Sequence, residues 1–137
     1  MTSTHHLTLD LPYAQAVESV RAALSEQGFG IITEIDMRAS LEKKLDAAAA
    51  EEVGDYVILG ACNPGLARRA LAAEPQLGVL LPCNVIVRGG GDGVHSIVDA
   101  MDPKVMVQLS ESDDVREVAD DADVRVRAAL ASLSHPG

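Results

Sequence analysis

The two cysteines are the residues of this sequence best suited to chemistry, and an asparagine follows each of them, in Cys62-Asn63 and Cys83-Asn84. Thiolates bind soft metals such as Cu(I) or Zn, and a dithiol can also cycle with a disulfide. The alternative is purely structural, because small buried thiols behave as hydrophobic groups and asparagines cap helices and turns. The spacing is not CxxC, and two sulfur ligands are too few for a closed structural zinc site.

A second candidate is a helix start at Asn63-Pro64, where asparagine is a typical N-cap and proline a typical first residue. The free N–H groups there could hold an anionic or carbonyl-bearing ligand, assisted by Arg68 or Arg69. Most helix ends are simply capped, so this pattern alone is weak. The predicted ligand-binding residues are Cys62, Asn63, Pro64, Arg68, Cys83 and Asn84, with Cys62 and Cys83 as the candidate metal ligands.

The other polar groups have simpler interpretations. The segment Gly89–Gly93 lacks the Lys-Ser/Thr of a P-loop and fits a hairpin turn. The acidic residues between positions 111 and 123 do not follow EF-hand spacing and fit a solvated helix face. His5-His6 could bind metal, although a frayed terminus rarely makes a selective site, and His95 is expected on a strand. Because no general base can be assigned, a binding module is favoured over an enzyme.

Length and composition indicate one domain over residues 1–137, with a core from about 5 to 133. With one Phe, two Tyr and no Trp, the core must be aliphatic. The net charge of −10 argues against nucleic acid and against an anionic membrane surface, since both need a basic face. The N-terminus MTSTHHLTLDLP lacks the features of a signal peptide, and two cysteines make no disulfide framework. We therefore expect a cytoplasmic protein with free thiols and no cofactor.

The pattern of apolar residues predicts the elements that position these groups. We expect strands at residues 7–11, 29–35, 56–61, 84–88 and 94–99, with a break at Pro82, which cannot donate to a ladder. We expect helices at residues 12–27, around 41–45, at 64–74, just after Asp102-Pro103, and from Ser112 to about Leu133. The segment Ala47–Gly54 either extends a helix or forms a mobile connection, and we favour the connection because no long apolar side chain anchors it.

This order predicts an α+β fold with two layers, in which N- and C-terminal helices pack on an antiparallel sheet and short helices are inserted between strands. Cys62 ends one predicted strand and Cys83 begins another. If these strands are antiparallel neighbours, the two thiols meet at one end of the sheet.

Several blocks of the chain resemble a known family. The segments Glu26–Leu45, Tyr56–Pro64 and Leu80–Val87, followed by Asp102-Pro103, are together similar to the domain of unknown function 302 family, and the similarity extends from Pro12 to about Leu133. The resemblance implies a strand–helix–four-strand–helix arrangement like that of the TATA-binding-protein fold. It also implies dimers, and it implies no activity. The family's motif positions correspond to Asn63, Pro64, Pro82, Cys83 and Asn84, whereas Ala47–Gly54 lies outside the pattern.

We therefore hold three hypotheses. The first is a non-enzymatic, homodimeric module that binds a small ligand or partner near the two Cys-Asn dipeptides. The second is thiol redox or copper or zinc handling through Cys62 and Cys83. The third, an enzyme using a cysteine and the asparagines, ranks last because no base is identifiable.

Overall fold

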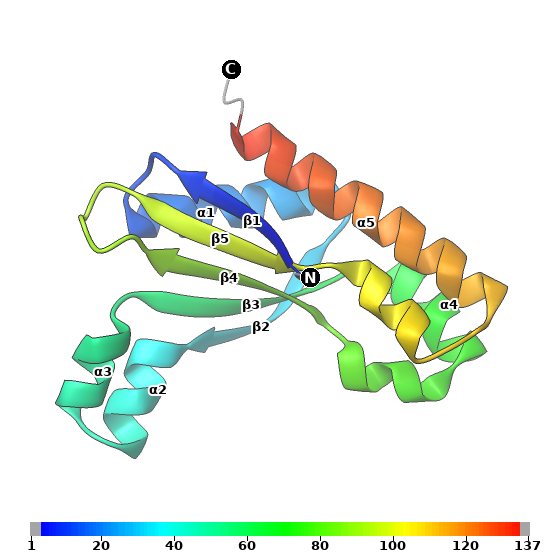
Figure 1. The fold of residues 1–137 in the computed structure, drawn as a ribbon, viewed down its shortest axis with the longest axis horizontal. Helices are drawn as coiled ribbons and strands as arrows, with labels where there is room; N and C mark the ends of the chain where they lie inside the picture. The colour runs from blue at the N-terminus through cyan, green and yellow to red at the C-terminus, as the bar shows by residue number, and fades with distance from the viewer. Residues whose placement is uncertain (1–3, 135–137) are drawn as a thin grey trace.

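The computed structural model describes residues 4–134, which form one five-stranded antiparallel sheet with helices on one of its faces (Figure 1). The strand order is β1-β5-β4-β3-β2, and every neighbouring pair is antiparallel. The strands are β1 (Thr4–Leu9), β2 (Gly30–Asp36), β3 (Tyr56–Cys62), β4 (Cys83–Gly89) and β5 (Ser96–Met101).

Two long helices flank this sequence of strands, and shorter helices are inserted between them. The α-helices are α1 (Tyr13–Glu26), α2 (Met37–Lys44), α3 (Ala47–Val53), α4 (Pro64–Ala73) and α5 (Asp113–Ser134). Two 3₁₀ helices, η1 (Pro75–Leu80) and η2 (Pro103–Gln108), precede β4 and α5. The predicted α+β class and element order are confirmed.

The main core lies between the sheet and the helices α1 and α5. Alternate residues of the central strands are buried on this side, as Val57, Leu59 and Ala61 are on β3. They pack with aliphatic side chains of both helices, including Val20 and Val126. The alternation is that of a sheet covered on one face, so the register fixes which side chains reach the core.

A second, smaller core forms where the N-terminal half of α5 extends beyond the sheet. It joins α4, η1 and η2 to α5 through Ala70, Leu77, Met106 and Val118. Figure 1 shows these elements gathered at one end of the molecule, while α2 and α3 lie at the other.

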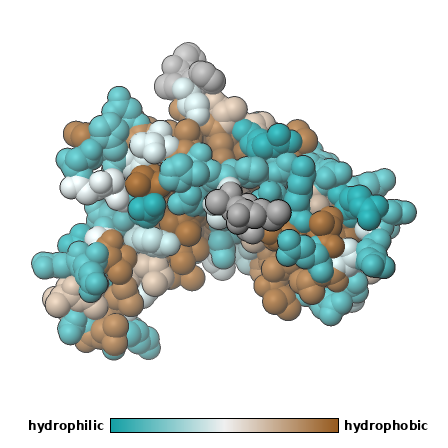
Figure 2. All heavy atoms as spheres, viewed as in Figure 1, coloured by the Kyte–Doolittle hydropathy of each residue, from teal (hydrophilic) through white to brown (hydrophobic). Residues whose placement is uncertain are grey.

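Within residues 4–134, no layer of helices covers the second face of the sheet. Ile58, Ile86 and Ile97 lie on it and are partly exposed, and Ile35 on the edge strand β2 is exposed. Figure 2 shows apolar side chains at the surface in the middle of the sheet, between hydrophilic ones.

Three local predictions were wrong. His5-His6, expected at a frayed terminus, lie in β1 and pair with Ala100 and Asp99 of β5. The segment Ala47–Val53 is a helix, because Asp46 caps it by accepting from Ala49 N at 2.8 Å and Ala50 is buried. The helix is thus stabilised by a cap and a small buried side chain. His95 precedes β5, since the Asp92 carboxylate accepts from the N–H groups of Val94 and His95 and holds them in the turn.

Among the described residues, no helix is both long and apolar enough to cross a membrane.

Candidate functional site

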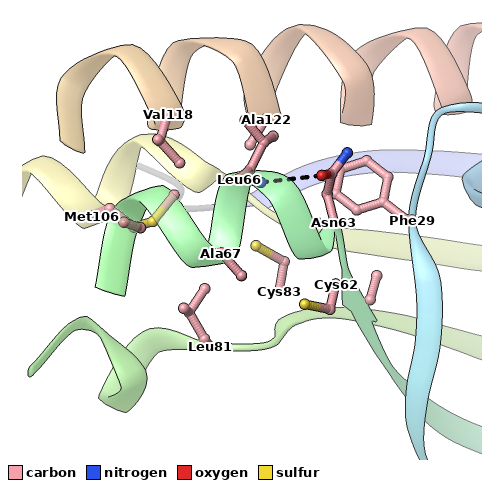
Figure 3. Close-up of a pocket in the computed structure, with 12 residues that line it drawn as sticks. Phe29, Cys62, Asn63, Leu66, Ala67, Leu81, Cys83, Met106, Val118 and Ala122 are labelled. Carbon is pink, nitrogen blue, oxygen red and sulfur yellow. Dashed lines mark hydrogen bonds between the residues drawn. The ribbon is translucent and has the colours of Figure 1, made fainter. Parts of the chain in front are cut away.

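A small cavity lies at the junction of the two cores, beneath α4 and next to the ends of β3 and β4 (Figure 3). Its volume is about 20 Å³, enough for about one water molecule. The walls are almost entirely apolar apart from two thiols and one amide. The lining residues are Phe29, Ala61, Cys62, Asn63, Leu66, Ala67, Ala70, Leu81, Cys83, Met106, Val118 and Ala122.

Both cysteines reach this cavity because β3 and β4 are antiparallel neighbours. Cys83 pairs with Ala61 in the ladder, and Cys62 is the next residue of β3, at the point where the strand ends. Cys83 is buried among the core residues on the helix side, whereas Cys62 ends β3 and remains partly exposed. Figure 3 shows both side chains below α4, where β3 ends and β4 begins. The two strands that carry the thiols are therefore antiparallel neighbours, as the sequence analysis assumed.

Burial controls the acidity of the inner thiol. Loss of hydration raises the pKa of Cys83 to about 11, and the neighbouring Cys62 adds to the rise. Cys83 is thus a neutral thiol near pH 7 unless a bound cation displaces its proton. Both cysteines are free thiols.

Asn63 faces the cavity, but its side chain also has a structural task. Its Oδ1 accepts a hydrogen bond from Leu66 N at 3.2 Å and caps α4, and Pro64 is the first residue of the helix. The predicted cap and proline start are confirmed. The amide nitrogen of Asn63 lies against Gly28, where an added methyl group would be 3.0 Å away.

The other three predicted ligand-binding residues lie outside the cavity lining. Pro64 and Arg68 are exposed on α4, and Asn84 is exposed on β4 next to buried Cys83 and Val85. Their roles in ligand binding stay predictions. The structure brings Cys62, Asn63 and Cys83 together, and it places Pro64, Arg68 and Asn84 around them at the surface.

Sequence reasoning missed the apolar part of the wall. Phe29, Met106 and Val118 come from three distant segments, and each looks like an ordinary core residue in the sequence. Met106 is 1% exposed and adds a thioether to the lining. No local pattern distinguishes a residue that borders a cavity from one that fills the core.

A wider groove of about 620 Å³ opens at the opposite end of the sheet, and three of its charged or titratable side chains, Arg38, Asp55 and His95, have partners. His95 Nδ1 lies 2.6 Å from Asp92 Oδ2, and its Nε2 lies 3.2 Å from Asp10 Oδ1. Arg38 pairs with Asp55 at 3.2 Å. The hydrogen bond to Asp92 raises the pKa of His95. These pairings account for the groups, so the cysteine cavity is the better candidate site.

Comparison with known proteins gives a family and a fold. The family model described as domain of unknown function DUF302 matches residues 5–133. The chain is also similar to a solved structure, the crystal structure of an uncharacterized conserved protein DUF302 from Bacillus stearothermophilus, with a TM-score of 0.79 and 24% identity over 96% of this chain and 98% of that one. No curated protein matches the chain.

Proposed function

The chain belongs to the family called domain of unknown function DUF302, and from that premise we propose that it is a non-enzymatic binding module whose cavity takes one soft metal ion, Cu(I) first. One observation carries the proposal: two free thiols from adjacent strands line the same small apolar cavity. Thiolate sulfur selects Cu(I) over hard cations, and an apolar wall contributes no competing oxygen ligands.

The size of the cavity favours an ion over an organic ligand. A volume of about 20 Å³ holds about one water molecule, far below the roughly 300 Å³ of typical small-molecule pockets. The one amide in the wall, Asn63, already caps α4. A small organic ligand or partner at Asn63, Arg68 and Asn84 would therefore bind at the rim rather than inside.

The high pKa of the Cys83 thiol favours the metal-binding hypothesis over the thiol-catalysis hypothesis. A thiol whose pKa is about 11 is a weak nucleophile at neutral pH, so dithiol–disulfide cycling or an enzymatic role is disfavoured. Metal binding tolerates a high pKa, because the ion displaces the thiol proton as it binds. The alternative of thiol redox chemistry is therefore ranked below soft-metal binding.

The test is anaerobic native mass spectrometry of reduced protein after addition of Cu(I) and removal of excess metal. We expect one copper per chain in the unaltered protein and none in the Cys62→Ser, Cys83→Ser double variant. The His6→Ala variant is the matched control, since His6 is exposed and lies outside the cavity lining. Equal copper retention by the double variant would overturn the proposal. Circular dichroism of the variant is the check that it is folded.

The homodimer is a second part of the proposal, and the open face of the sheet supports it. Ile58 and Ile86 are partners in the β3–β4 ladder and lie partly exposed on this face. Arg88 and Asp99 lie on the same face and pair with each other within one chain, with Nη2 and Oδ2 3.9 Å apart, so the charge beside the isoleucines is balanced and does not oppose the approach of a second copy. The occupant that fits this face is therefore a second copy of the chain.

Sedimentation equilibrium tests the dimer. We expect a dimer for the unaltered protein and a shift to monomer for Ile86→Lys, which places a charge in the middle of the open face. The control is Val79→Lys, because Val79 is 82% exposed on η1 and lies away from this face. A monomer at high concentration of the unaltered protein would end this part of the proposal.

We further propose a reducing, cytoplasmic setting and no nucleic-acid partner. The free thiols support the first point, and the net charge of −10 supports the second.

A further inference from the structure

A group of metal-ligating side chains lies away from the cysteine cavity, where β1, the end of β5 and α5 meet. His5 of β1, Asp102 after β5 and Asp123 of α5 each direct one ligand atom to a common point, and these atoms all lie within 4.8 Å of one another. Within residues 4–134 this is the one such group with at least three histidine, cysteine or carboxylate members. We propose that it is a binding site for one divalent transition-metal ion, with Zn²⁺ as the fitting example.

The distances suit a single ion. His5 Nε2 lies 2.7 Å from Asp123 Oδ1 and 3.9 Å from Asp102 Oδ1. Zinc bonds of about 2.0–2.2 Å allow two ligands of one ion to lie at most about 4.3 Å apart, and about 3.4 Å in a tetrahedral site. Moving the imidazole nitrogen about 0.7 Å away from Asp123 and about 0.5 Å toward Asp102 brings both of its distances to that value, and the two carboxylates, whose ligand atoms lie within 4.8 Å of each other, close around the ion.

The chemistry of the donors selects the class of cation. One imidazole nitrogen and two carboxylate oxygens form a set used by zinc, whereas magnesium and calcium prefer oxygen ligands alone. His5 and Asp102 side chains are 25% and 26% exposed, so a water molecule can complete the coordination from the solvent side.

The neighbouring groups hold the two carboxylates in place. The second oxygen of Asp123 forms an ion pair with Arg127 Nε at 3.0 Å and lies 3.6 Å from Lys104 Nζ, which leaves Oδ1 facing His5. Asp102 Oδ1 accepts from Lys104 N at 2.9 Å and so caps η2. Outer partners of this kind orient ligating carboxylates in metal sites. The two cations also offset the negative charge, which favours moderate over very tight binding.

The Asp123 carboxylate is 3% exposed, which distinguishes this group from an ordinary acidic surface cluster. Metal binding would join the edge strand β1 to η2 and α5 through a single ion. The same ion would replace the hydrogen bond between His5 and Asp123 by two coordinate bonds.

Isothermal titration of the full chain with Zn²⁺ tests the site, using protein in which Cys62 and Cys83 are both serine so that the cysteine cavity cannot contribute. We expect one Zn²⁺ per chain, and at least about tenfold weaker binding after His5→Ala or Asp102→Asn. His6→Ala is the matched control: the adjacent histidine bonds Asp99 at 2.7 Å and lies outside the group, so its loss leaves the affinity unchanged.

Absence of Zn²⁺ binding, equal affinity in His5→Ala, or an equal loss in His6→Ala would each overturn the inference. Asp102→Asn keeps an oxygen that can cap η2, so its expected effect is on Zn²⁺ affinity with little change in thermal stability. Because the titrated variant lacks both cysteines, the result for Zn²⁺ is independent of the outcome of the Cu(I) experiment.

Discussion

Ala61 of β3 lies directly opposite Cys83 of β4 in the antiparallel ladder. This register places the Cys83 side chain on the helix-covered side with Ala61, where both are buried. Cys62, one residue further along β3, is partly exposed at the point where the chain leaves the sheet. The candidate metal site is therefore asymmetric, with one thiol open to solvent and one shielded from it.

The asymmetry predicts different reactivity of the two thiols. At pH 8 we expect iodoacetamide to modify Cys62 at least about tenfold faster than Cys83, because burial holds the pKa of Cys83 near 11 and keeps it protonated. Peptide mapping by mass spectrometry after timed quenching measures both rates. The Cys83 rate should rise toward pH 11 or on unfolding in urea. Equal rates for the two thiols in the folded protein at pH 8 would contradict the burial argument.

Asn63 provides a test that separates a structural cap from a ligand. Asn63→Ala should lower the free energy of unfolding by about 1 kcal/mol, because the N–H of Leu66 loses its acceptor. Asn63→Asp keeps the acceptor and should retain most of the stability. Urea denaturation gives both values. If the aspartate variant loses as much stability as the alanine variant, the cap is not the main contribution of this side chain.

Gly60 of β3 should not tolerate a side chain. A methyl group there would overlap Thr33 Oγ1 and lie 2.7 Å from Pro82 Cγ, so Gly60→Ala should cost about 1–3 kcal/mol of unfolding free energy. The matched control is Gly65→Ala in α4, where the nearest atom would be at an ordinary 3.6 Å. Alanine favours a helix more than glycine does, so that change should be neutral or stabilising. Thermal denaturation measures the stability of both variants. A lower stability for Gly65→Ala than for Gly60→Ala would refute this account.

Asp123 should make stability depend on pH in acid. Burial alone would raise its pKa, but the hydrogen bond from His5 and the charges of Arg127 and Lys104 outweigh burial, and the net pKa is lowered. A lowered folded-state pKa means that the stabilisation is present above the unfolded value of about 4 and is lost as pH falls through the folded one.

Asp123→Asn should therefore cost about 1–2 kcal/mol at pH 7, because His5, Arg127 and Lys104 lose their anionic partner while the two cations, which are more than half exposed, remain hydrated. The difference between the two proteins should shrink below pH 4. Denaturant unfolding at pH 7, 5 and 3.5 measures it. The exposed helix residue Asp120 serves as the control, and Asp120→Asn should change stability little at every pH. A difference for Asp123→Asn that stays constant into acid would be evidence against the ion-pair explanation.

The sequence was informative wherever a local signal existed. Asn63-Pro64 marked the start of α4, and Gly28, with φ of 85°, stands where a left-handed residue ends α1. Pro82 marked the interruption before β4. Asn63 acts on the adjacent backbone through its side-chain oxygen, and Gly28 and Pro82 act through their own backbone, so each effect is local and can be predicted without knowing the fold.

The parts that could not be predicted depend on contacts between distant segments. α3 was expected to be a mobile connection because its alanines look weak, yet burial of Ala50 and the Asp46 cap stabilise it. His5 was dismissed as a terminal residue, and only the pairing of β1 with β5 places it beside Asp102 and Asp123. A separation of 118 residues between His5 and Asp123 carries no signal in the sequence.

The hairpin of α2 and α3 has a practical consequence for handling the protein. No residue of α2 is buried, and the hairpin lies at the end of the molecule opposite α4. The link around Leu45, whose side chain is 68% exposed, is therefore a suitable place to graft a fluorophore or a reporter domain. Such a graft would leave both candidate metal sites free of the attached group.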